Sequence, residues 1–351
     1  METRIITWNE PGFSPEESSW IKETIGKGEL IAFPTETVYG LGGDGFNPGA
    51  SQKIYQAKGR PSDNPLILHI SDLSMLSDIA REIPDVAYIL AEKFWPGPLT
   101  MIFKKKAEVP VETTGGLFTV AVRMPDHPAA LAMIQMAETP IAAPSANLSG
   151  KPSPTRMEHV TADLGGKIAG LIDGGEVGIG YESTIVDLTE KEPLILRPGY
   201  ITAKMLEETL GNVEKDPGLE GEGRPKAPGM RYRHYAPKAE MVVFYGTVAK
   251  QKETIRNRAE EYLKKGYRED EIGILATRES KQEYPVGRVL CCGSRQDDTM
   301  GHDLYHVLRE FDGLGVRVIL SEGFDDSPKA EALMNRMRKA SGNHMIKVDM
   351  E

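Results

Sequence analysis

Two cations and several polar side chains cluster between Lys58 and Asn64, directly after a segment with helical periodicity. Lys58 and Arg60 could bind a phosphate, because arginine offers a bidentate fork and lysine a mobile point charge. A solvated loop is the competing interpretation of this cluster. The sequence has no Walker phosphate loop, and no Gly-x-Gly-x-x-Gly segment leaves a strand to open a helix, so a nucleotide would have to be held in another way.

Two further polar segments leave apolar, strand-like runs. Residues 34–42 place hydroxyls and a carboxylate beside glycines that would let a ligand approach the backbone. Residues 143–153 are rich in small hydroxyl and amide side chains, which could hydrogen-bond a triphosphate or a ribose. An ordinary turn is the competing interpretation of both segments.

Arg123 and Arg197 each end an apolar strand-like run, and sites built on sheets tend to form at the carboxyl ends of strands. Burying either cation without an anion would be costly. The anion could be a bound carboxylate or phosphate, or equally a structural Asp or Glu. His69 lies in another apolar run and by itself is more typical of a hydrogen-bonded core histidine than of a ligand.

A possible metal site is suggested by His302 and His306, which have the i, i+4 spacing of zinc hydrolases. Asp303 stands where such enzymes have a catalytic Glu, and no third ligand is evident. This pattern favours a solvated helix face. The two cysteines, Cys291 and Cys292, cannot complete a zinc site and are interpreted as buried strand residues.

The elements that must position these residues alternate between strand-like and helical patterns. A chain of 351 residues predicts two domains. We expect a mixed α/β domain with a large sheet at 1–212, a linker or lid rich in Gly, Pro and charge at 213–239, and a smaller doubly wound parallel α/β domain at 240–351. The first helix should begin at Ser14-Pro15-Glu16-Glu17, a capping-box pattern.

Composition narrows the possible functions. The 42 Lys and Arg against 52 Asp and Glu give a formal net charge of −10, which argues against a dedicated nucleic-acid coat protein. No signal pattern or long apolar run occurs, so a cytoplasmic protein without a membrane association is predicted.

The Lys58-Gly59-Arg60, Ser145-Ala146-Asn147 and Pro34 to Leu41 motifs together resemble the signature of the YrdC-like family, in the order typical of that family. The chain is similar to its longer members, the two-domain threonylcarbamoyl-AMP synthases. The resemblance is dense from Gly28 to Leu210 and continues through His234-Tyr235-Ala236-Pro237 and Ala332 to Arg336.

The resemblance implies a nucleotidyltransferase that joins L-threonine, bicarbonate and ATP, carried with Mg²⁺, into threonylcarbamoyl-adenylate for tRNA modification. It implies a twisted sheet around a cationic cavity and a Rossmann-like second domain. Hand-over to a tRNA threonylcarbamoyl-transferase is implied, whereas stable nucleic-acid binding is not. The residues carried over to the threonine side are Thr37, His69, Arg123, Ala143 and Ser183. Those carried over to ATP are Lys58, Arg60, Asn64, Thr119, Ser145, Asn147, Ser153, Arg197 and Tyr235, of which Lys58, Arg60, Ser145 and Asn147 would be catalytic.

Three alternatives remain open at this point. A double-stranded-RNA-binding module could use the same cationic cavity, although the net charge opposes it. A carbamoyl-transfer domain, as in hydrogenase-maturation proteins, would need acylphosphatase-like and zinc-finger segments that this sequence lacks. A metallohydrolase would depend on His302 and His306.

Overall fold

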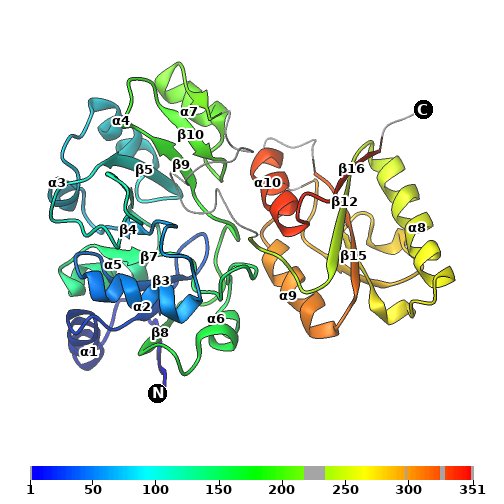
Figure 1. Ribbon diagram of the computed structural model, residues 1–351, viewed down its shortest axis with the longest axis horizontal. Coiled ribbons are helices and arrows are strands. Elements are labelled where there is room, and N and C mark those ends of the chain that lie inside the picture. The colour runs from blue at the N-terminus through cyan, green and yellow to red at the C-terminus, as the bar shows by residue number, and fades with distance from the viewer. Residues whose placement is uncertain (1, 217–233, 297–298, 325–328, 349–351) are drawn as a thin grey trace. The chain divides into compact units, whose positions relative to one another are not determined.

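The computed structural model describes residues 2–216, 234–296, 299–324 and 329–348 (Figure 1). The chain divides into two compact units, Met1–Ser149 with Ser153–Tyr232, and Gly150–Pro152 with Arg233–Glu351. Part of the predicted linker, residues 217–233, lies outside the described residues. Within the described residues, no helix combines the length and the apolar character needed to cross a bilayer.

The first unit is built on one mixed sheet of 11 strands in the order β1-β8-β2-β3-β7-β4-β6-β5-β9-β10-β11. Its strands are β1 (Arg4–Thr7), β2 (Ile31–Phe33), β3 (Gly40–Asp44), β4 (Ile67–His69), β5 (Leu99–Lys104), β6 (Thr119–Arg123), β7 (Ile141–Ala143), β8 (Gly170–Asp173), β9 (Thr184–Asp187), β10 (Leu194–Arg197) and β11 (Glu214–Lys215). Its α-helices are α1 (Pro15–Gly26), α2 (Pro48–Lys58), α3 (Leu76–Ile79), α4 (Asp85–Phe94), α5 (Pro128–Ala137), α6 (Met157–Leu164) and α7 (Ala203–Leu210). The predicted large mixed sheet is confirmed.

Helices cover the two faces of this sheet unequally. Side chains of α2, α3, α4, α6 and α7 join the main core, which includes Leu68, Met101 and Val122. Side chains of α1 and α5 pack on the other face, beneath β1, β2, β3, β7 and β8. Further along that second face a small apolar cluster of Ile67, Ile102, Ala121, Ile185 and Leu196 lies entirely on strands. This part of the sheet carries the candidate site.

The second unit has a five-stranded parallel sheet in the order β14-β13-β15-β12-β16. Its elements are β12 (Glu240–Gly246), α8 (Val248–Lys264), β13 (Ile272–Ala276), β14 (Arg288–Cys291), α9 (Leu304–Leu314), β15 (Val318–Glu322), α10 (Ala330–Ala340) and β16 (Met345–Val348). The sheet lies between α8 on one side and α9 and α10 on the other (Figure 1). The predicted parallel α/β architecture is confirmed.

Strand β3 was not predicted, because its Gly-Leu-Gly-Gly-Asp sequence is poor in strand formers. The glycines are explained by close packing of the neighbouring side chains. A Cβ atom on Gly42 would lie 2.7 Å from Ile141 Cγ2 and 2.9 Å from Phe33 Cε1. The helix α5 was also missed, because its sequence is apolar on all sides and gives little helical periodicity.

Cys291 and Cys292 differ in their surroundings. Cys291 is the last residue of β14 and is half-buried, while Cys292 follows the strand and is fully buried. The prediction of two buried strand residues is therefore wrong about the burial of Cys291 and about the strand position of Cys292. Burial raises the pKa of both thiols, which leaves them in the unreactive thiol form at neutral pH.

The predicted capping box at the start of α1 is present. The Glu17 backbone N–H donates to Ser14 Oγ at 3.3 Å, and the Glu17 carboxylate accepts from the Ser14 backbone N–H at 2.8 Å. Ser14→Ala is expected to lower the free energy of unfolding of this unit by about 1 kcal/mol, because the cap is lost.

Urea unfolding would measure this change. Ser19→Ala, the same substitution on the exposed face of α1, is the matched control, and it should leave stability unchanged or raise it slightly because alanine favours helix. Equal destabilisation by both substitutions would contradict a specific role for the cap.

Candidate active site

Lys58 joins two motifs that lie far apart in the sequence. It is the last residue of α2, and its side chain is buried although it carries a charge. Its Nζ donates to the backbone carbonyls of Ser145 and Asn147, both at 2.5 Å. Ser145 Oγ in turn donates to Asn147 Oδ1 at 2.5 Å. The structure therefore brings together three of the four residues predicted to be catalytic.

The loop after α2 places Arg60 and Asn64. Gly59 has a φ of 62°, a left-handed conformation that lets the chain turn directly after Lys58. Arg60 donates to the backbone carbonyl of Asn64 at 3.3 Å and to that of Pro65 at 3.2 Å. The Asn64 side chain is 1% exposed, and among the described residues its Oδ1 atom has no hydrogen-bond partner. A donor on a ligand would satisfy this oxygen.

Arg123 is a buried cation among the residues predicted to bind threonine. Its guanidinium donates to the Gly97 carbonyl at 3.2 Å and to Thr37 Oγ1 at 2.9 Å. Its Nη2 atom lies 2.6 Å from Glu36 Oε1. Of the two partners considered for this arginine, the structure shows the structural one, an acidic side chain. Glu36 was not predicted as a site residue, although it lies within the polar segment 34–42.

Strand register places several predicted residues on one face. His69 is paired with Arg123 on β6 and with Ile141 on β7, and Ile67 is paired with Ala121 and Ala143. Paired residues share a face, and so do residues two apart along a strand. His69, Arg123, Ala143 and Thr119 therefore lie on the sheet face that carries the Ile67 apolar cluster. Thr119 begins β6 and Arg123 ends it, so they lie at opposite ends of that strand.

Arg197 and Ser183 form a second buried polar group. Arg197 donates to the Ser183 carbonyl at 3.1 Å and to Ser183 Oγ at 3.2 Å. The Ser183 and Thr100 hydroxyl oxygens are 2.7 Å apart. Ser153, also buried, donates to the Glu182 carboxylate at 2.6 Å. Thr100 and Glu182 were not predicted, because no local sequence motif marks either residue. Their contacts with Ser183 and Ser153 exist only in the folded chain.

Tyr235 belongs to the second unit, and the structure does not test its predicted role over ATP. Its side chain is buried and stacks on Tyr305, with ring centroids 5.1 Å apart and ring planes inclined by 24°. The backbone N–H of Ala236 donates to the Gly150 carbonyl at 2.8 Å. The earlier part of the aromatic and basic segment, Met230 to Arg233, lies outside the described residues.

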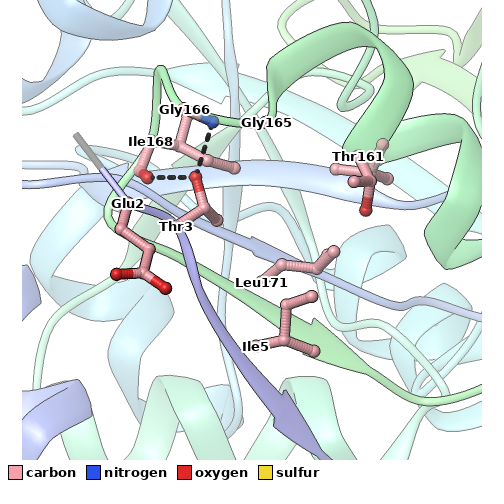
Figure 2. Close-up of a pocket in the computed structure, with 9 residues that line it drawn as sticks. Glu2, Thr3, Ile5, Thr161, Gly165, Gly166, Ile168 and Leu171 are labelled. Carbon is pink, nitrogen blue, oxygen red and sulfur yellow. Dashed lines mark hydrogen bonds between the residues drawn. The ribbon is translucent and has the colours of Figure 1, made fainter.

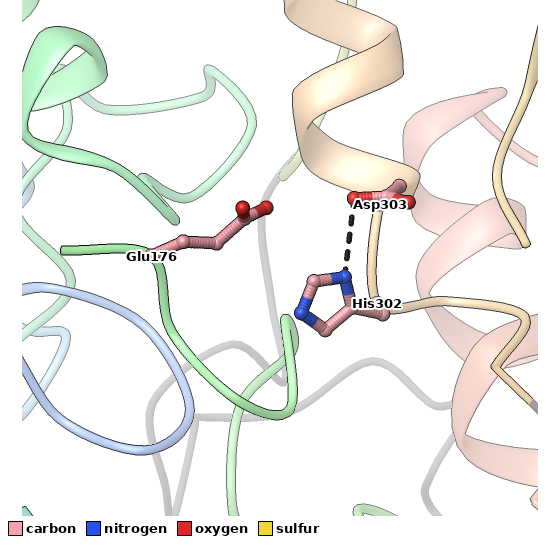
Figure 3. A group of neighbouring side chains, drawn as sticks. All are labelled: Glu176, His302 and Asp303. Atoms are coloured by element: carbon pink, nitrogen blue, oxygen red, sulfur yellow. Dashed lines mark hydrogen bonds and ion pairs between the residues drawn. The ribbon is translucent and has the colours of Figure 1, made fainter.

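The two histidines of the possible metal site do not share a helix. Helix α9 begins at Leu304, so His302 precedes it and only His306 lies on it. His302 Nδ1 lies 3.1 Å from the Asp303 carboxylate (Figure 3), and His306 lies 3.9 Å from Glu310. Glu176, also drawn there, belongs to the first unit and pairs with Arg156 at 2.7 Å. The prediction of one solvated helix face is thus wrong for His302.

A pocket of about 300 Å³ lies beside the edge strand β1, away from the predicted residues (Figure 2). Its polar groups bond to one another: Thr3 Oγ1 donates to the Ile168 carbonyl at 2.8 Å and accepts from the Gly166 N–H at 2.9 Å. A pocket of about 530 Å³ does include Lys58 and Gly59, together with Lys53 and Lys167.

His69 is held in the neutral form. Burial, assisted by the nearby Arg123 cation, lowers the pKa of its imidazole to about 3, and its Nδ1 lies 3.2 Å from the Ile67 carbonyl. Between pH 3 and about 6.5 the unfolded chain binds a proton here that the folded chain does not, so stability falls as the pH drops below about 6.5. This histidine should cost about 2 kcal/mol of stability between pH 6.5 and pH 5.

Urea unfolding of wild type and His69→Gln at pH 8 and pH 5 would measure that cost. At pH 8 the difference in the free energy of unfolding between the two proteins measures the contacts that the substitution removes. At pH 5 the deficit of the variant should shrink by about 2 kcal/mol, because the glutamine has no proton to bind. A deficit that is the same at both pH values would contradict a neutral, buried imidazole.

Two family models match the chain. The model for the Sua5, YciO and YrdC proteins, described as "Telomere recombination", matches residues 23–199. The model described as "Threonylcarbamoyl-AMP synthase, C-terminal domain" matches residues 201–342.

The chain is similar over most of its length to curated relatives. It is 47% identical over 327 residues to the threonylcarbamoyl-AMP synthase of Pyrococcus abyssi, which covers 92% of this chain and 94% of that protein. It is 48% identical over 322 residues to that of Bacillus subtilis, with 91% of each chain covered. The crystal structure of P. abyssi Sua5 complexed with L-threonine superposes with a TM-score of 0.92 at 44% identity, covering 99% of this chain and 100% of that one.

Proposed function

This chain belongs to the threonylcarbamoyl-AMP synthase family, and from that premise we propose that it condenses L-threonine, bicarbonate and ATP into threonylcarbamoyl-adenylate with release of pyrophosphate. The observation that carries the proposal is the meeting of Lys58 with the Ser145–Asn147 segment through two short hydrogen bonds. The names of the relatives support this enzyme and not the RNA-binding alternative.

Threonine would bind on the face that carries Arg123. Its carboxylate needs a cation, and the Arg123 fork supplies one. Its hydroxyl needs a polar partner, for which Thr37 Oγ1, 2.9 Å from the guanidinium, and the Ser183 hydroxyl are the candidates. His69, buried and neutral, adds no second positive charge beside the substrate amine.

ATP would bind along the segments that carry Lys58, Arg60 and Ser145, with Asn64 Oδ1 as an acceptor for a ligand donor. The carbamate oxygen formed on threonine then attacks the α-phosphorus, and pyrophosphate leaves. Lys58, Arg60 and Arg197 would neutralise the charge that develops on the phosphates, so catalysis is mainly alignment and electrostatics.

Magnesium would arrive with ATP and add further charge neutralisation. The residues assigned to ATP are cations or neutral polar groups, so its ligands would be phosphate oxygens rather than side chains. Tyr235 as part of a closing lid stays a prediction. Delivery of the product to a tRNA-modifying transferase, and a cytoplasmic location, are likewise predictions from the family.

Pyrophosphate release from ATP should require threonine and bicarbonate together, and Ser145→Ala should weaken the use of ATP. The lost hydroxyl removes the hydrogen bond that orients Asn147, so KM for ATP should rise about tenfold while KM for threonine changes by less than about twofold. A coupled pyrophosphate assay over both substrates measures the two constants.

The matched control is Ser19→Ala, at an exposed position of α1 outside the proposed ATP-binding segments, which should behave as wild type. Release of pyrophosphate without threonine would contradict the proposed reaction. Equal rises in both KM values for Ser145→Ala would contradict only its assignment to ATP.

A further inference from the structure

The Glu36 carboxylate is enclosed but incompletely satisfied. Its side chain is 12% exposed and that of Arg123 is 5% exposed. The Arg123 Nη2 and Glu36 Oε1 atoms are 2.6 Å apart but are not aligned as a hydrogen bond. Among the described residues, both carboxylate oxygens of Glu36 are buried without a hydrogen-bond donor. A buried carboxylate in this state favours a ligand that brings N–H or O–H donors.

Hydrogen bonds hold the backbone on both sides of Glu36. Thr35 Oγ1 donates to the Val38 carbonyl at 2.7 Å and accepts from the Thr37 N–H at 3.2 Å. The Glu36 carbonyl accepts from the Ile179 N–H at 2.8 Å. The loop therefore fixes the point from which the Glu36 side chain extends toward Arg123.

We infer that Glu36 binds the α-ammonium group of the amino-acid substrate and takes one proton from it, which makes the amine nucleophilic. The inference rests on the proposed function, because it takes threonine to be the ligand of Arg123. A zwitterion carries a carboxylate and an ammonium on one carbon atom. The Arg123–Glu36 pair presents the complementary cation and anion side by side, so insertion of the zwitterion would leave every buried charge paired.

The other titratable groups near Glu36 are poorly suited to accept this proton. Arg123 on β6 is a cation. His69 on β4 has a pKa of about 3, lowered by burial and by Arg123. His127, at the start of α5, also has a pKa lowered by burial, although the nearby Glu36 and Asp126 partly offset this. Its Nδ1 atom already accepts from the Ala129 N–H at 3.2 Å.

The proton balance of the step is simple. The ammonium gives one proton to a Glu36 oxygen, which leaves the nitrogen with a free electron pair. The nitrogen lone pair then forms the C–N bond to bicarbonate. The hydroxyl of bicarbonate leaves with a second nitrogen proton as water, which yields the carbamate. Glu36 returns its proton to solvent when the products leave.

Glu36→Gln tests the inference, because it keeps the size and polarity of the side chain but removes the charge. Calorimetry should show L-threonine binding at least tenfold more weakly to the variant. Binding of 3-hydroxybutanoate, which has a hydrogen atom in place of the ammonium, should change by less than twofold. The kcat for pyrophosphate release should fall about 100-fold or more, and the remaining rate should rise with pH as free amine becomes available.

The matched control is Glu23→Gln, which removes a carboxylate that pairs with Lys27 at 2.6 Å on the exposed surface of α1; it should keep wild-type binding and turnover. ATP binding and the thermal melting curve report whether each variant is folded. If Glu36→Gln does not fold, Glu36→Asp keeps the charge one methylene shorter, and it should bind threonine within tenfold of wild type with a reduced kcat and a wild-type pH profile.

Equal loss of threonine and of the amine-free analogue by Glu36→Gln would overturn the inference, as would a kcat and pH profile like those of wild type. The inference would also be overturned if Glu36→Asp lost affinity for threonine and for the amine-free analogue to the same extent. A failure of the proposed function looks different: wild type itself would then bind no threonine or release no threonine-dependent pyrophosphate.

Discussion

The structure of the first unit is constrained by the burial of three cations. Lys58, Arg123 and Arg197 are each between 3% and 4% exposed, and an ionised side chain is costly to remove from water. Lys58 donates to two backbone carbonyls, and Arg197 donates to a carbonyl and a hydroxyl. These carbonyl and hydroxyl oxygens replace part of the hydration that each cation loses on burial. At Arg123 the carboxylate of Glu36 supplies a negative charge as well.

On the sheet face that carries Arg123, the helices that the structure describes pack toward one end of the sheet. Side chains of α1 and α5 cover that face beneath β1, β2, β3, β7 and β8, where a conventional apolar core forms. Beyond them, the small cluster around Ile67 and Ala121 lies wholly on strands. His69 and Arg123 project on this same face at the ends of β4 and β6. The parallel strands β4 and β6 thus place the His69 imidazole and the Arg123 guanidinium side by side at their carboxyl ends, next to the apolar cluster.

The second unit shows a different use of buried polar groups. Glu322, fully buried at the end of β15, accepts from the Tyr284 hydroxyl at 2.6 Å and from Thr277 Oγ1 at 3.2 Å. These bonds tie the loops after β13 to β15 and satisfy the carboxylate within the unit. Tyr235 is fixed within the same unit by its stacking on Tyr305. The end of the linker therefore packs within this unit.

The sequence by itself determined the large mixed sheet, the parallel second sheet, the capping box at Ser14 and the family, because hydrophobic periodicity, turn chemistry and contiguous motifs are local properties. It also indicated the polar segments around Lys58, Glu36 and Ser145. Only the tertiary structure decided which of their atoms meet. The contact between Lys58 and Asn147 spans 89 positions, and that between Arg123 and Thr37 spans 86. No local pattern encodes such pairings, since strand order and register create them; for the same reason the partner of Arg123, left open by the sequence, became visible only in the fold.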